Sequence, residues 1–251
     1  MWRDIKDNYA SAWAFALACP FLFLIPPMVE FAQHAAEIHI GMYESIAAAR
    51  DVADNALRMQ FGFAKTLALL LPHYWFTRYI LSGRNAAFAR KLAMPAIGLW
   101  LVLFALQGVQ LWWSLFGPSL PGLIGLSGKT GLWTGYGMAF LWGVIGIYFT
   151  AWAVAWPLGN ASIGPIASAR IMAGNFWRTI VILISAVLPL MAVHYAFSFA
   201  AMGRPAWLVW AMMAVDAVMV GFMALTMAGG GAVAARTAAG RKGINMLPST
   251  G

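Results

Sequence analysis

The side chains best suited to take part in chemistry are one carboxylic acid and one imidazole in the most apolar part of the chain. Asp216 is the one acidic residue deep inside an apolar stretch, and His194 lies in the apolar stretch before it. A charge at the bilayer centre costs about 2.5–3.5 kcal/mol on insertion scales, so Asp216 must be paired, protonated or hydrated. Because histidine changes its charge near neutral pH, an Asp–His pair in such a place can carry a proton or hold another ion.

Two further polar residues, His73 and Gln107, lie in other apolar stretches. With a rise of 1.5 Å per residue, all four side chains come to lie about 12–18 Å from one membrane face. The sequence therefore predicts a midplane polar cluster of Asp216, His194, His73 and Gln107. Two interpretations stay open: a proton relay or ion site, and a structural interhelical hydrogen bond worth about 0.6–2 kcal/mol.

Motifs of enzymes are missing from the sequence. It has no His-Glu-x-x-His pair and no phosphate-binding glycine loop. His34 and His39 have Glu30 and Glu37 near them and could form a metal site, but residues of a hydrated loop explain the same pattern. We therefore expect no catalytic residue, no cofactor and no metal site, and the sequence favours a protein that is not an enzyme.

The composition excludes an ordinary soluble domain. The chain is 62% hydrophobic and 10% charged, with a mean hydropathy of +0.75, whereas soluble domains have about 25% charged residues. Stretches of about 20 apolar residues recur, each long enough to cross the hydrocarbon core as a helix. The net charge of +8 does not indicate nucleic-acid binding, because the basic residues are dispersed through short loops. A single cysteine excludes an internal disulfide.

The pattern predicts an all-α fold, a polytopic transmembrane helical bundle of about six spans plus amphipathic helices, in a single domain over residues 1–236. The first span is expected to bend at Pro20 and to end near Pro26-Pro27. Between the first two spans, an amphipathic helix is expected from about Tyr43. The expected segments are spans at 10–31, 61–81, 96–116, 132–156, 176–202 and 205–233, an outer amphipathic segment at 33–60 and a flexible cytoplasmic tail at 237–251.

Charge predicts the orientation, because cytoplasmic loops of membrane proteins carry an excess of Lys and Arg. With the N-terminus inside, eleven of the sixteen basic residues fall on the inner side. This predicts a multi-pass protein of the inner (plasma) membrane with both termini cytoplasmic.

One stretch, Ile166–Arg178, has a sequence that resembles a known family. It reads as a small-residue amphipathic helix ending in Gly-Asn-Phe-Trp-Arg before an apolar helix, and Asp7-Asn8-Tyr9 precedes the first span in a compatible way. This resembles the membrane domain attached to some bacterial glycerophosphodiester phosphodiesterases, and the related stand-alone six-helix membrane proteins. The resemblance implies about six helices and an accessory role, and it assigns no catalytic residue.

Taken together, these observations predict an integral membrane protein that acts as a non-enzymatic accessory or scaffold for a membrane partner or for lipid handling. The alternative is a small transporter or channel-like protein with a midplane proton or ion site at Asp216. The expected partners are the lipid bilayer and a membrane protein or a second copy of the chain, and not nucleic acid.

Overall fold

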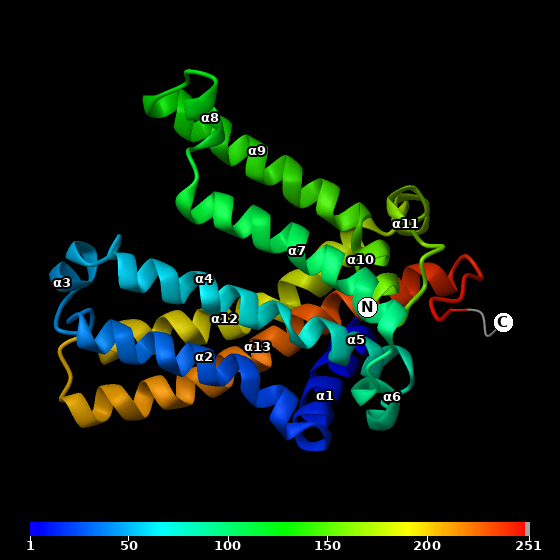
Figure 1. Cartoon of the computed structure of the whole chain (residues 1–251), viewed down its shortest axis with the longest axis horizontal. Helices are drawn as coiled ribbons and strands as arrows, with labels where there is room; N and C mark the ends of the chain where they lie inside the picture. Colours follow the sequence, from blue (N-terminus) through cyan, green and yellow to red (C-terminus); the bar gives the residue numbers. More distant parts are fainter. Residues whose placement is uncertain (249–251) are drawn as a thin grey trace. The chain divides into compact units, whose positions relative to one another are not determined.

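The computed structural model describes residues 1–248, and every regular element in that range is a helix, which confirms the all-α prediction (Figure 1). The helices, in chain order, are α1 (Trp2–Ala18), α2 (Pro20–His39), α3 (Ile46–Asp51), α4 (Ala56–Leu70), α5 (Pro72–Leu81), α6 (Ala86–Arg90), α7 (Met94–Phe116), α8 (Leu120–Leu123), α9 (Gly128–Tyr148), α10 (Thr150–Leu158), α11 (Pro165–Met172), α12 (Phe176–Ala201) and α13 (Ala206–Gly240).

The chain divides into two compact units. Unit 1 contains Met1–Lys91 and Val181–Val233, and unit 2 contains Leu92–Ile180 and Ala234–Gly251, described as far as residue 248. The long helices α12 and α13 contribute residues to both units. Of the predicted polar cluster, Asp216, His194 and His73 lie in unit 1, and Gln107 lies in unit 2.

In unit 1 the first apolar segment is two helices joined at a sharp bend. α1 and α2 meet at 100°, and Cys19 between them has a non-helical backbone with φ −135° and ψ 56°. Pro20 starts α2, where its missing N–H would have had no helical partner. The bend lies where the sequence predicted it, but the predicted end near Pro26-Pro27 is wrong. α2 continues through both buried prolines to His39, since packed neighbours make proline tolerable inside membrane helices.

The hydrophilic segment at 33–60 differs from its prediction. It does not form one amphipathic helix from about Tyr43; its first part belongs to α2, and its remainder forms the short α3 and the start of α4. Two local caps explain the division. The hydroxyl of Ser45 accepts a hydrogen bond from the Ala48 N–H, and the side chain of Asn55 accepts one from the Leu57 N–H. Each cap satisfies a free N–H at a helix start and so begins a new helix.

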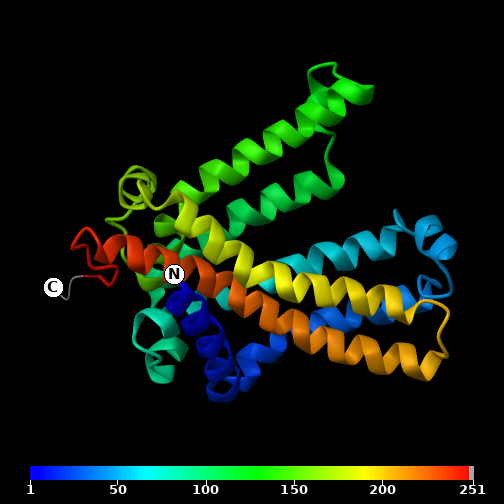
Figure 2. The ribbon, with the colours of Figure 1, turned by 180° about the vertical axis from the view of Figure 1, so that it is seen from behind.

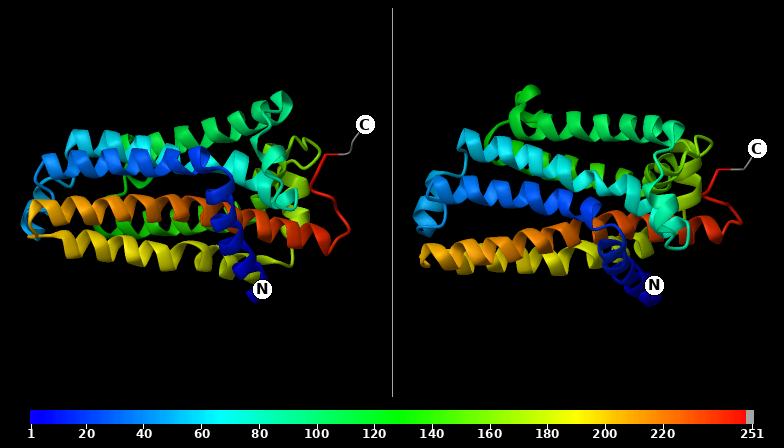
Figure 3. Two further views of the ribbon diagram at one scale, coloured as in Figure 1. Left: turned by 90° about the horizontal axis from the view of Figure 1, so that it is seen from below. Right: turned by 60° about the horizontal axis from the view of Figure 1, so that its bottom comes forward.

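Four helical segments of unit 1 lie side by side as rods, namely α2, α4 and the unit-1 parts of α12 and α13 (Figures 2 and 3). α12 and α13 run antiparallel, joined at residues 202–205. At that turn a small core forms from Tyr43, Ala201, Val209 and Met213. The Gly203 N–H donates to the Tyr43 carbonyl at 2.9 Å, so the loop after α2 is fixed to the α12–α13 turn.

Unit 2 contains a second bent pair, α9 and α10, which meet at 50°. Ser168 of α11 satisfies backbone groups at the bend. Its hydroxyl accepts a hydrogen bond from the Trp152 N–H at 2.9 Å and donates one to the Tyr148 carbonyl at 2.7 Å. Gly159 ends α10 in a left-handed conformation with φ +92°, and a Cβ there would lie 3.4 Å from Ala96 of α7. α7, α10 and α11 are therefore packed around one another.

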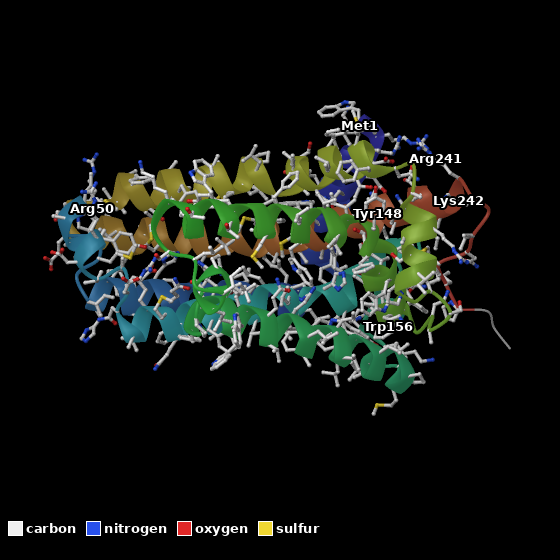
Figure 4. All side chains as sticks on the ribbon, turned by 90° about the horizontal axis from the view of Figure 1, so that it is seen from above. Met1, Arg50, Tyr148, Trp156, Arg241 and Lys242 are labelled. Atoms are coloured by element: carbon white, nitrogen blue, oxygen red, sulfur yellow. The ribbon has the colours of Figure 1, made fainter. Side chains whose placement is uncertain are left out.

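The predicted flexible tail at 237–251 is ordered as far as the structure describes it. Its first residues complete α13, and Met246 is buried and accepts a hydrogen bond from Asn160. Figure 4 labels Arg241 and Lys242 at the end of α13; Arg241 donates to Asn175 Oδ1 at 2.7 Å and Lys242 to the Arg170 carbonyl. Small alanines let the helix end pack closely. Residues 249–251 of the predicted tail lie outside the described part.

Within residues 1–248, three helices are long and apolar enough to cross a membrane: α7, α12 and α13. The bent pairs α1–α2 and α9–α10 pass the same test together, which brings the number to as many as five. The predicted span at 61–81 is not among them, because it falls on α4 and α5, which are 15 and 10 residues long and contain Lys65 and Arg78. Six spans are therefore not confirmed.

Large apolar side chains are exposed along the candidate spans. In unit 2, Trp133 and Phe140 of α9 are 69% and 70% exposed, and Val109 of α7 is 67% exposed. Large apolar side chains that are exposed together on a protein surface mark contact with a membrane or another protein. Several helices could therefore face the hydrocarbon of a bilayer.

Candidate functional site

One face of α2 carries three ionisable residues into the interior of unit 1. Glu30, His34 and Glu37 are spaced i, i+4 and i+7, which places them on the same side of a helix. All three are buried, with exposures of 0%, 2% and 3%. Their positions follow from the continuation of α2 past its prolines.

Asp216 of α13 and His194 of α12 face this side of α2. His194 Nδ1 lies 2.7 Å from Asp216 Oδ2, and His34 Nε2 lies 2.9 Å from the same oxygen. Asp216 is fully buried, and the side chain of His194 is 13% exposed. The predicted pairing of Asp216 with His194 is thus present, and His34 joins it from a third helix.

Close approach of α13 to α2 makes this contact geometrically available. Gly221 lies against Pro27, where a Cβ would be 2.5 Å from the proline ring. Phe222, the next residue, packs its ring 4.9 Å from that of Phe23. A small residue at such a crossing lets two helix backbones come together, and Asp216 lies just over one turn before it in α13.

His34 is the centre of the network. Its Nε2 lies 2.9 Å from Asp216 Oδ2 and 3.2 Å from Glu30 Oε1. Its Nδ1 lies 3.0 Å from Glu37 Oε2 and 3.0 Å from the Tyr43 hydroxyl. Both ring nitrogens therefore have carboxylate neighbours, in a buried part of the protein.

Two basic residues reach the outer carboxylates from α4. Lys65 Nζ donates to Glu30 Oε1 at 2.9 Å, and Arg58 Nε lies 3.3 Å from Glu37 Oε1. Gln33 also donates to Glu37 Oε1 at 2.8 Å. Within the described residues, Asp216 contacts two histidines, His34 and His194. Its charge is thus the one that Lys and Arg do not compensate directly.

Tyr43, in the loop after α2, fixes the orientation of the His34 ring. Burial, and then the charge of Glu37, raise the pKa of the Tyr43 hydroxyl above its ordinary value, so the phenol keeps its proton. The hydroxyl donates to Glu37 Oε2 at 3.0 Å, which leaves its oxygen free to accept from His34 Nδ1–H. This arrangement places a proton on Nδ1 of His34, whether the ring is neutral or charged.

The opposite nitrogen of the His34 ring, Nε2, faces two carboxylates. With its proton on Nδ1, a neutral His34 directs the Nε2 lone pair at two carboxylate oxygens, those of Glu30 and Asp216. The Nε2 lone pair then lies 2.9 Å from Asp216 Oδ2 and 3.2 Å from Glu30 Oε1, and such a close approach of lone pairs is repulsive in a medium of low dielectric constant. A positive charge, a proton or a metal ion, must stand among them.

Comparison of the chain with family models, with curated proteins and with solved structures found no match. The resemblance to the phosphodiesterase-associated membrane domain therefore stays a prediction that rests on residues 166–178. The function of the site is therefore inferred from its own geometry.

The other two members of the predicted cluster do not join it. Over residues 1–248, the hydrogen bonds and ion pairs of the cluster do not include His73, which lies in α5. Gln107 lies in α7 of unit 2, where it lines a pocket of about 600 Å³ with Gln110, Trp113 and Trp142. The predicted contact between Asp216 and His194 is present, and the prediction did not include their neighbours Glu30, His34, Glu37, Tyr43 and Lys65.

Proposed function

We propose that this chain is an integral membrane protein of the transporter or channel-like class that binds a cation at the cluster of Glu30, His34, His194 and Asp216. The observation that supports the proposal is the convergence of His34 Nε2 with the Glu30 and Asp216 carboxylates. The depth of the cluster adds to it. Asp216 lies ten residues into α13, about 15 Å along the helix axis, which is near the midplane if α13 begins at a membrane face.

A buried charged cluster of this kind is expensive to keep. Intramembrane Asp, Glu, Lys and His residues are rare, and they mark ion pathways and proton relays. A purely structural hydrogen bond would need only two of these side chains, whereas five ionisable residues of four helices meet here, namely Glu30, His34, Lys65, His194 and Asp216. Cation binding accounts for the whole set.

The decisive experiment measures cation flux into proteoliposomes that contain the purified full chain. Asp216→Asn is expected to reduce the flux at least about tenfold, because it removes a charge-assisted contact worth about 1.5–3 kcal/mol. Asp54→Asn, the same substitution at an exposed position, should leave the flux unchanged. Protons, sodium, potassium, manganese and zinc ions serve as the tested cations.

An absence of flux for every one of these cations would reject the transporter assignment. It would leave the accessory or scaffold role, with a membrane partner or in lipid handling, as the remaining prediction from the sequence. Equal flux through wild type and Asp216→Asn would reject the role of the cluster while keeping transport.

We also infer a location in the bacterial inner (plasma) membrane, with both termini cytoplasmic. The distribution of Lys and Arg supports it, since eleven of the sixteen fall on the side of the termini in the predicted threading. Reporter fusions that are active only in the cytoplasm should be active at both ends of the chain. Activity at one end alone would show an odd number of spans.

A further inference from the structure

We propose that the cation is a divalent first-row transition metal of the zinc type, held by Glu30, His34, His194 and Asp216. This rests on the proposed function, because it identifies the cation that the cluster binds. One ligand atom from each of the four residues lies within 4.8 Å of every other. The separations of 2.9 and 3.2 Å around His34 Nε2 approach the roughly 3.3 Å edge of a tetrahedron with metal–ligand bonds of about 2.0–2.1 Å, and the 2.7 Å between His194 Nδ1 and Asp216 Oδ2 would lengthen around the metal ion.

The types of donor atom select the metal. Sodium, potassium, magnesium and calcium ions prefer oxygen ligands, whereas this set offers two imidazole nitrogens and two carboxylates. Imidazole suits zinc, copper, iron and nickel ions. Two nitrogens with two oxygens in a four-coordinate arrangement are typical of a zinc site, and no cysteine is needed.

Two buried carboxylate oxygens give an independent indication of a ligand. Glu30 Oε2 and Asp216 Oδ1 have no hydrogen-bond partner among the described residues, and both side chains are fully buried. The second oxygen of each carboxylate has contacts in the metal-free structure, Glu30 Oε1 with Lys65 and Asp216 Oδ2 with the two histidines, and the histidine nitrogens would exchange theirs for the metal ion. Buried polar atoms almost always have a partner, and a bound metal ion supplies one to both free oxygens.

Glu37 and Tyr43 complete the site from behind His34. A histidine that binds a metal usually donates its other ring N–H to a carboxylate or carbonyl, which fixes the tautomer and the ring plane. His34 Nδ1 lies 3.0 Å from Glu37 Oε2, and Glu37 is held in turn by Gln33, Tyr43 and Arg58. Glu37 is thus a positioning residue that directs Nε2 toward the other three ligands.

The test measures metal content in the full chain, purified in detergent, stripped with a chelator and reloaded with zinc or cobalt. Wild type is expected to retain about one metal ion per chain, and the cobalt form should show the visible absorption of a four-coordinate ion. His34→Gln and Asp216→Asn should lose the metal. Glu37→Gln should keep the cobalt spectrum but bind metal about 10–100-fold more weakly.

His39→Gln is the matched control, because His39 lies on the same helix and is exposed; it should bind metal as wild type does. Should His34→Gln or Asp216→Asn fail to fold, a rise in the melting temperature of wild type on zinc addition still decides, since a ligand of the folded state stabilises it. Wild type that neither retains zinc nor gains stability from it overturns the metal site, as does full metal retention in both variants.

The two proposals fail separately. Flux of protons or sodium ions through a protein that binds no transition metal overturns the metal assignment and leaves the proposed function intact. Stoichiometric metal with no flux of any cation overturns the transporter and keeps the metal site.

Discussion

Lys65→Met is expected to destabilise the metal-free protein by about 3–5 kcal/mol, because it leaves a buried carboxylate without its ion-pair partner. Lys65 donates to Glu30 Oε1 at 2.9 Å, and the side chains are 19% and 0% exposed respectively. Methionine keeps most of the volume of the lysine stem, so the loss measures the uncompensated charge of Glu30. The free energy of unfolding in detergent, from denaturant titration monitored by tryptophan fluorescence, is the measurement.

The double variant Glu30→Gln/Lys65→Met tests the cause. Removing both charges leaves no buried ion, and such replacements are often close to neutral. The double variant should therefore be more stable than Lys65→Met alone, with a coupling energy of about 0.5–3 kcal/mol. Lys129→Met, at an exposed lysine, should change stability by less than about 0.5 kcal/mol. A similarly small change for Lys65→Met would contradict the ion pair.

The contact between Asp216 and His194 could be predicted from the sequence because it depends on only two things, the connection of the two helices and the depth of each residue along its helix. Two apolar helices joined by a short turn must run antiparallel, and the rise per residue then puts the two side chains at similar depths. The structure gives them a separation of 2.7 Å. Depth and connectivity were sufficient in this case.

Depth alone failed for His73 and Gln107. A helix has a rotation as well as a height, and only the packing of its neighbours determines which face is inside. Gln107 lies in unit 2 on a helix with an exposed apolar surface, and His73 lies beyond the break between α4 and α5. Equal depth of two polar residues along their helices is thus not evidence that their side chains are in contact.

The missed residues have one physical cause. The sequence predicts that the first span, 10–31, ends near Pro26-Pro27, and a hydrated loop then explains His34 with Glu30 and Glu37 near it. Proline breaks helices in water, but packing can hold it inside a helix, as the contact between Pro27 and Gly221 does here. The i, i+4, i+7 spacing of the three side chains was the available signal.

Gly229→Ala is expected to destabilise the protein, although alanine is the better helix former by about 0.8–1.0 kcal/mol. A Cβ at Gly229 would lie 2.6 Å from Phe76 Cε1 and 2.1 Å from Asn8 Oδ1. The ring of Phe76 is fully buried and cannot retreat into solvent. Overpacking of this kind costs about 1–3 kcal/mol, so the steric cost exceeds the gain in propensity.

The position of Asn8 adds to the loss. Its side-chain amide donates to the Thr226 carbonyl at 2.8 Å and joins α1 to α13. Displacing it leaves buried polar groups unpaired, at a cost of about 1–3 kcal/mol. Gly62→Ala in α4 is the matched control, because a Cβ there meets no atom within 4 Å, and it should be neutral or stabilising. Melting temperatures in detergent should therefore move in opposite directions for the two substitutions, and a rise for both would show that α13 does not pack against α1 and α5 as closely as the structure places it.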